Sequence, residues 1–271
     1  MITFEGNKQA LKPAKLLEAK ARNIYPHIST SRLRTQIGYE GADPEFFKRI
    51  KSSYSLMRKM IKQSDDYYSA IVYALSEGKV GNCTEDAMFT ELLGKINGQK
   101  NIYTGSIGIE RNGESKFLDH AIAFITDQPI ESGKRNYFKN KDAIVIDPWL
   151  GITDFAGNYF AKLKSTYRKI FMHSKNKIFG TFTNDKLAME LLRSEAKTPK
   201  EFNTLKKDCC PKTRLSIIPF IDSSLNQEKI NELKTFFPEL IIKSFKRISI
   251  PNKKAKIISM KKDWIKNLFI G

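Results

Sequence analysis

The chain has 271 residues, of which 41% are hydrophobic, so it is long enough for a substantial core in one or two domains. Its formal net charge of +18 favours acidic partners, namely nucleic acid, anionic lipid or an acidic protein. Three cysteines are too few for a disulfide framework, and the longest apolar runs, AIAFI and AIVI, are far too short to span a bilayer. Because the N-terminal residues show no signal peptide, we expect a cytoplasmic protein or one translocated into a host cell.

The N-terminal part of the chain contains two predicted helices. Residues 1–42 have mixed character and form an N-terminal extension that could be an arm or a short helix. A helix is predicted from Asp43, with Pro44 at its first position, to about Met60. A second helix covers DDYYSAIVYALSEG and ends at Gly78, a residue suited to the left-handed cap.

The stretch GNCTEDAMFTELL begins a third helix, predicted over residues 83 to about 97. Asn82 is a favourable N-cap, and Glu85 lies where its carboxylate can bond the cap's backbone N–H, which predicts a capping box. Cys83 is then the first helical residue, where free N–H groups and the helix dipole favour the nucleophilic thiolate. Glu85 and Asp86 oppose that effect, so the cysteine needs a base. The predicted core-facing residues of this helix are Ala87, Met88, Leu92 and Ile96.

Three strand-like segments follow: NIYTGSIGI, FLDHAIAFI and DAIVIDPWL. If the last two form a hairpin in which Ile125 pairs with Asp142, His120 lies directly opposite Asp147, at about 4.5–5.5 Å between Cβ atoms. A shift of one or two residues is compatible with the pattern, and a one-residue slip would separate the pair onto opposite faces. With Cys83 the arrangement predicts a nucleophile, a base and an orienting acid.

Each of these residues has a common structural role when taken alone: a core cysteine, a hydrogen-bonded strand histidine and an Asp-Pro turn. Their combination favours catalysis. His27 and His173 lie in polar, loop-like segments and are expected at the surface. The adjacent Cys209 and Cys210 have no partner motif, so we expect no metal site, and without a Gly-rich phosphate loop we expect no cofactor.

The second half of the chain is less informative. Helices are predicted at NDKLAMELLRSEA, TPKEFNTLKK and NQEKINELKTFF, and strands at RLSIIPFI, LIIKSF, RISI and KIISM. We divide the chain into residues 1–42, a core over 43–175 and a basic region over 176–271, which could also form one domain with the core. The Lys-rich end predicts weak, salt-sensitive binding to anionic surfaces, and a solvated lysine surface without a partner is the alternative.

The GNC at a helix start, together with DHAIAFI and VIDPWLG, resembles the papain-like and transglutaminase-like cysteine enzymes, especially divergent bacterial toxins and translocated effectors. The resemblance covers roughly residues 65–155. It implies an α+β papain-like core in which a Cys-bearing helix packs on an antiparallel sheet. By this resemblance Cys83 is the nucleophile, His120 the general base and acid, and Asp147 the orienting residue.

The resemblance implies a cysteine-dependent amide hydrolase, either a protease or a protein glutamine deamidase, that acts on a protein, possibly of a host cell, through a thioester. Transglutaminases and acyltransferases use the same triad, and a non-enzymatic basic module is the competing class. LSEGKVGN lacks the glutamine that papain-like proteases place before the cysteine, so the expected oxyanion donors are the Cys83 N–H and Asn82. Trp149 is expected near the site or in the core.

Overall fold

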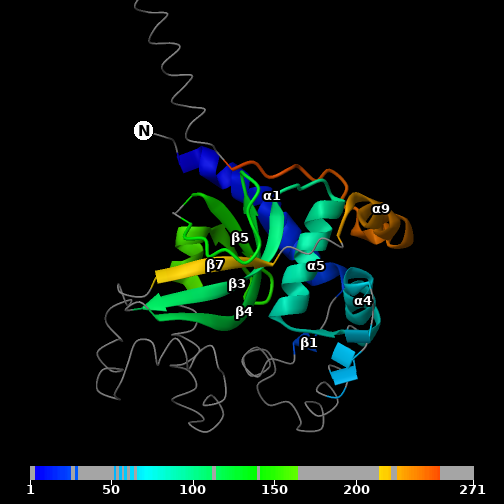
Figure 1. The fold of residues 1–271 in the computed structure, drawn as a ribbon. Coiled ribbons are helices and arrows are strands. Elements are labelled where there is room, and N and C mark those ends of the chain that lie inside the picture. Colours follow the sequence, from blue (N-terminus) through cyan, green and yellow to red (C-terminus); the bar gives the residue numbers. More distant parts are fainter. Residues whose placement is uncertain are drawn as a thin grey trace, which may run out of the picture.

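The computed structural model describes residues 4–25, 28–29, 66–111, 114–138, 141–163, 214–220 and 225–250, together with isolated positions between 52 and 63. This part of the chain combines helices with a five-stranded antiparallel sheet (Figure 1), so the predicted α+β class is confirmed. Asp43, Pro44 and the helices predicted within 184–207 lie outside the described residues, as do both proposed domain boundaries and the strand predicted at KIISM.

The helices and strands have the following bounds. The helical elements are α1 (Phe4–Ile24), α4 (Tyr67–Tyr73), the π-helical turn η1 (Ala74–Gly78), α5 (Cys83–Ile96), α9 (Gln227–Phe236) and the 3-10 turn η3 (Pro238–Leu240). The sheet strands are β3 (Ile102–Arg111), β4 (Glu114–Thr126), β5 (Ala143–Asp147), β6 (Ile152–Phe155) and β7 (Arg214–Phe220). The two-residue strands β1 (Ile28–Ser29) and β2 (Val80–Gly81) pair in parallel, and residues 156–163 are also helical.

The strand order of the main sheet is β6-β5-β4-β3-β7, with every neighbouring pair antiparallel. The strand predicted at RLSIIPFI is confirmed as β7, which pairs with β3 from Thr104↔Phe220 to Glu110↔Arg214. The helix predicted at NQEKINELKTFF is confirmed as α9. Residues from the second half of the chain therefore complete the same sheet that carries the predicted histidine and aspartate.

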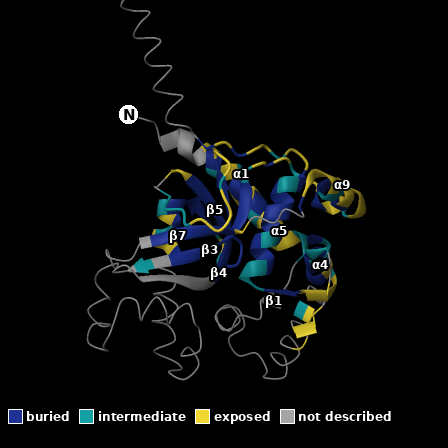
Figure 2. Cartoon of the chain, viewed as in Figure 1, coloured by how far each residue is buried: buried dark blue, intermediate teal, exposed yellow. Residues whose placement is uncertain are grey.

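Each face of the sheet packs against its own hydrophobic cluster. Successive side chains of a strand point to opposite faces, so on β5 Ile144 and Ile146 join one cluster while Ala143 and Val145 join the other. The first cluster contains residues of α1, α4, α5 and α9, and the second contains residues of helix 156–163. In Figure 2 most of the sheet is buried, and α5 lies between the sheet and the helices α4 and α9.

Helix α5 packs on the sheet as the sequence predicts. Ala87, Leu92 and Ile96 are buried, and the partly buried Met88 contacts the first cluster. Gly94 lets the helix approach β3 closely, because a Cβ at this position would lie 2.6 Å from Cδ1 of Ile102. Helix α5 and strand β3 are thus in close contact at Gly94.

The helical segment before the cysteine ends at Gly78, as predicted, but Gly78 does not take the left-handed cap position. Helix α4 begins after Asp66, whose Oδ1 accepts a 3.0 Å bond from the Ser69 N–H, and it continues into the π-helical turn η1. Lys79, with φ 50°, takes the left-handed position, so the predicted cap at Gly78 is wrong. The π-helical turn includes Gly78, so the left-handed residue is the first one after it, Lys79.

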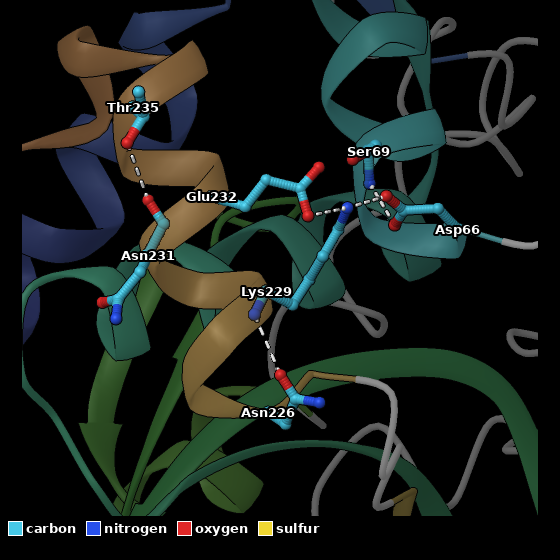
Figure 3. Close-up of polar contacts among 7 residues, drawn as sticks. All are labelled: Asp66, Ser69, Asn226, Lys229, Asn231, Glu232 and Thr235. Atoms are coloured by element: carbon cyan, nitrogen blue, oxygen red, sulfur yellow. Dashed lines mark hydrogen bonds and ion pairs between the residues drawn. The ribbon is translucent and has the colours of Figure 1, made fainter.

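Helix α4 is tied to α9 by a charged side chain. Lys229 of α9 forms an ion pair with Asp66 at the start of α4 and a 2.9 Å bond with Glu232 (Figure 3). Asn226 caps α9 by accepting a 2.9 Å bond from the Lys229 N–H. The second half of the chain therefore holds the segment that leads into the cysteine helix.

The strands predicted at LIIKSF and RISI are wrong, because residues 241–250 are irregular. Asn97, just after α5, donates a 2.9 Å bond to the Leu240 carbonyl and accepts a 2.7 Å bond from the Ile242 N–H. A side-chain amide has the same donor and acceptor groups as a peptide. The Asn97 amide therefore forms the hydrogen bonds with Leu240 and Ile242 that a neighbouring strand would otherwise form.

A second amide side chain holds the same segment further along. Gln99 accepts a 2.9 Å bond from the Ile248 N–H and donates a 3.3 Å bond to the Ile248 carbonyl. Gln99 is 3% exposed, and Ile248 and Ile250 are buried in the first cluster. The segment is thus fixed to the end of α5 by side-chain hydrogen bonds and by burial.

We predict that Gln99→Ala lowers the free energy of unfolding by about 1–3 kcal/mol, because it leaves a buried N–H and C=O of Ile248 unpaired. The matched control is Gln128→Ala at an exposed position, which should change stability by less than about 0.5 kcal/mol. Urea unfolding of both variants measures the difference. Equal stabilities would mean that the segment does not depend on Gln99.

Candidate active site

Cys83 is the first residue of α5, and the predicted capping box is present. Asn82 has an extended backbone, and its N–H donates a 2.9 Å bond to the Glu85 carboxylate. Immediately before it, β2 pairs in parallel with β1, which anchors the chain entering the helix. The position of the thiol is therefore fixed by a cap on one side and a strand pair on the other.

The Cys83 side chain is partly buried and packs against the second cluster, while the body of α5 packs against the first. Burial raises the pKa of Glu85, and the Arg58 guanidinium, 3.3 Å away, and the Asn82 N–H act in the opposite direction. The ion pair with Arg58 offsets the negative charge that the sequence places two residues from the thiol.

His120 lies on β4 where the strand is irregular. The β3–β4 register runs to Ser106↔Ala121 and resumes at Gly108↔Phe117, so residues 118–120 lie opposite the single residue Ile107. A β-bulge of this kind bends a strand and redirects its side chains. The bulge ends at His120, whose side chain is buried at 2% exposure.

The predicted register of β4 and β5 is wrong by two residues. Ile125 pairs with Ile144, not with Asp142, which instead lies in the turn before β5. A shift of two residues keeps His120 and Asp147 on the same face, because side chains alternate with a period of two. The two are diagonal neighbours, and it is the far nitrogen of the imidazole, Nε2, that reaches the carboxylate.

The Asp147 carboxylate is fully buried and accepts three hydrogen bonds. His120 Nε2 lies 2.7 Å from Oδ2, the Tyr159 hydroxyl donates to the same oxygen at 2.8 Å, and the Leu150 N–H donates to Oδ1 at 3.0 Å. These three contacts hold both oxygens of the carboxylate in place. Asp147 can therefore act as a fixed negative charge beside the imidazole.

His120 also interacts with Cys83. Burial by itself lowers the pKa of His120, but the charge and hydrogen bond of Asp147, together with a hydrogen bond and charge at Cys83, raise it to about 10. Because Nε2 is engaged by Asp147, Nδ1 is the ring nitrogen left for the thiol. The structure thus brings Cys83, His120 and Asp147 together from α5, β4 and β5.

Trp149 and Tyr159 complete the surroundings of the imidazole. The Trp149 ring lies 5.2 Å from the His120 ring between centroids and is 6% exposed, so it belongs both to the site and to the second cluster. Tyr159, in helix 156–163, was not predicted from the sequence. The only signal for it is the helical spacing of Ala156, Tyr159 and Leu163 in a segment after a four-residue strand.

Among the described residues, no group of three or more His, Cys, Asp and Glu side chains could hold a metal ion. No helix in the described part is long and apolar enough to cross a membrane. His27, His173, Cys209 and Cys210 lie outside the described residues. Asn82, one of the two expected oxyanion donors, is part of the capping box.

Comparison with known proteins gives no match to a family model, to a curated protein or to a solved structure.

We predict that Asn82→Ala destabilises the protein by about 1 kcal/mol through loss of the cap and slows alkylation of Cys83. Asn226→Ala, which removes the cap of α9, is the matched control. It should cost a similar amount of stability and leave Cys83 reactivity unchanged. Urea unfolding and iodoacetamide kinetics measure the two effects, and equal reactivity in both variants would contradict the role of this cap at the thiol.

The pH dependence of stability should depend on the His120–Asp147 pair. A histidine whose pKa rises from 6.5 to about 10 on folding stabilises the native state below pH 6.5, and this contribution is lost as the pH rises towards 10. We predict that the stability difference between wild type and Asp147→Asn is largest below pH 6.5 and shrinks by about 1 kcal/mol or more by pH 9. Urea unfolding across this range measures it, and a difference independent of pH would contradict the coupling.

Proposed function

We propose that this protein is a cysteine-dependent amide hydrolase with a papain-like core, in which Cys83, His120 and Asp147 form the catalytic triad. The observation that carries the proposal is the buried His120 imidazole, which bonds Asp147 at 2.7 Å and interacts with the thiol at the start of α5. A helix that presents a cysteine to a histidine and an aspartate on antiparallel strands supports the papain-like assignment.

In the proposed reaction the attacking group is the Cys83 thiolate, and His120, whose pKa of about 10 keeps it protonated at neutral pH, lies beside it as the acid. The thiolate attacks the substrate carbonyl carbon, forming a C–S bond and an oxyanion, towards which the Cys83 N–H can donate. His120 then protonates the leaving nitrogen, and the C–N bond breaks to leave a thioester. A water molecule, deprotonated by His120, attacks the thioester, and cleavage of the C–S bond releases the acid and restores the thiolate beside the protonated imidazole.

The exposure of the three residues limits how a substrate approaches. His120 and Asp147 are almost completely buried, whereas Cys83 is partly accessible. The carbonyl must therefore arrive at the sulfur side, while the acid–base pair stays out of water. We propose a protein substrate, attacked at a peptide bond or at a glutamine side chain, in the protein's own cytoplasm or in a host cell.

Transfer to an amine, as in a transglutaminase, or to another acyl acceptor uses the same three residues. Mass spectrometry of candidate proteins incubated with wild type and Cys83→Ala separates these reactions. Cleavage gives new termini, deamidation shifts the mass by about one dalton, and transfer to an amine gives a crosslink. We propose hydrolysis, because this reaction needs no acyl acceptor other than water.

A second candidate function is binding to anionic surfaces, which the net charge of +18 favours. In that case the Lys-rich end of the chain, residues 243–271, would be the functional region, and it lies largely outside the described residues. A buried charged pair contributes little net stability compared with apolar packing, so a protein that only binds has no use for the His120–Asp147 pair. The enzyme is therefore the better-supported function.

We predict that Cys83 reacts with iodoacetamide at pH 7 about tenfold faster than Cys209 or Cys210, because its thiol is partly accessible at a helix N-terminus, beside the protonated His120. His120→Ala should remove most of this advantage, because the protonated imidazole beside the sulfur is lost. Asp147→Ala should produce a smaller change in the same direction.

The matched control is His173→Ala, which removes a histidine that the sequence predicts at the surface and should leave the alkylation rate unchanged. Peptide mapping after brief labelling assigns the rates to individual cysteines. If Cys83 alkylates like an ordinary or buried thiol, with no dependence on His120, the binding function should replace the enzymatic one.

A further inference from the structure

We propose that Tyr159 is a positioning residue of the thiol site, which acts on His120 through the Asp147 carboxylate. This inference rests on the proposed function and deepens it, since it assigns a fourth residue to the same site. Tyr159 lies in helix 156–163, outside the segments that first suggested the triad.

The contact that carries the inference is a shared oxygen. The Tyr159 hydroxyl donates to Asp147 Oδ2 at 2.8 Å, and His120 Nε2 meets the same oxygen at 2.7 Å. The other carboxylate oxygen, Oδ1, accepts the Leu150 N–H at 3.0 Å. All three side chains are buried, at 0% exposure for Tyr159 and Asp147 and 2% for His120.

Two donors on one oxygen compete for its negative charge. A hydrogen bond from Tyr159 draws electron density away from Oδ2, which weakens the attraction of that oxygen for the imidazolium proton. The effect is strongest in a site without water, because nothing else screens or replaces the hydroxyl. The strength of the His120–Asp147 interaction therefore depends on the tyrosine.

The hydroxyl also fixes the direction of the carboxylate. Asp147 is the last residue of β5, where the backbone still pairs with Ile152 of β6 but the ladder with β4 has already ended. Tyr159 bonds one oxygen from the helix, and Leu150 bonds the other from the turn after the strand. With both oxygens held, Oδ2 is directed at His120 Nε2.

The titratable groups that interact with His120 are Asp147 from β5 and Cys83 from α5. Trp149 covers the ring without adding charge. Tyr159 therefore acts on the imidazole through Asp147. A change at Tyr159 that alters the titration of His120 reports this route, whereas a purely structural tyrosine would leave the titration unchanged.

The test is a histidine titration by ¹⁵N NMR of the full chain in a Cys83→Ala background, which removes the coupled thiol. The chain has only three histidines, so His27→Ala and His173→Ala assign the His120 signals. In Tyr159→Phe we expect the pKa of His120 to rise by about half a unit or more, because Oδ2 regains the charge that the hydroxyl withdrew while the Leu150 N–H still holds Oδ1 in place. A pKa that falls in this variant would contradict the proposed withdrawal of charge. The neutral ring should keep its proton on Nε2.

The matched control is Tyr68→Phe, which removes the hydroxyl of an equally buried tyrosine in the first cluster, on the other face of the sheet. It should leave the His120 titration unchanged. If Tyr159→Phe does not fold, 3-fluorotyrosine at position 159 replaces it. The fluorinated hydroxyl is more acidic and donates more strongly, so the pKa of His120 should fall.

A titration of His120 that is the same with tyrosine, phenylalanine or fluorotyrosine at position 159 overturns the positioning role. This titration is independent of the test of the proposed function. That test measures Cys83 alkylation in the protein with its thiol intact. If alkylation depends on His120 but the titration ignores Tyr159, only the present inference fails. If alkylation does not depend on His120, the function itself fails.

Discussion

The hydrogen bond between His120 and Asp147 makes the strongest demands on the surrounding structure. Two ionisable groups buried beside each other are costly unless every polar atom is satisfied and the geometry is held closely. The carboxylate meets that requirement with three donors, which come from β4, from the turn after β5 and from helix 156–163. The ring is covered by Trp149, so the interaction is kept out of water.

The bulge in β4 and the register between β4 and β5 give the His120–Asp147 pair the geometry that it needs. The β-bulge in β4 ends at His120, and the register with β5 leaves Asp147 diagonal to it, within reach of Nε2. Helix α5 crosses the opposite face through its apolar residues and brings Cys83, at its first turn, to the second cluster. The packing of α5 on one face of the sheet thereby places Cys83 beside the residues of the other face.

The second half of the chain stabilises this arrangement from a distance. Strand β7 completes the sheet beside β3, and Lys229 of α9 holds Asp66 at the start of α4. Asn97 and Gln99 then fix the segment up to residue 250 against the end of α5. The helix that carries the thiol is therefore held at both ends, by its own capping box and by these long-range contacts.

Local chemistry in the sequence determined the start of α5, its capping box and the strands that carry His120 and Asp147, because caps and alternating patterns depend on residues close together in the chain. The register, the bulge and the carboxylate contact of Tyr159 were decided only by the tertiary structure. A register shifted by two residues preserves the alternation, so the pattern cannot distinguish the two alignments. Tyr159 and Gln99 also act through contacts between separate elements, and no local spacing specifies such partners.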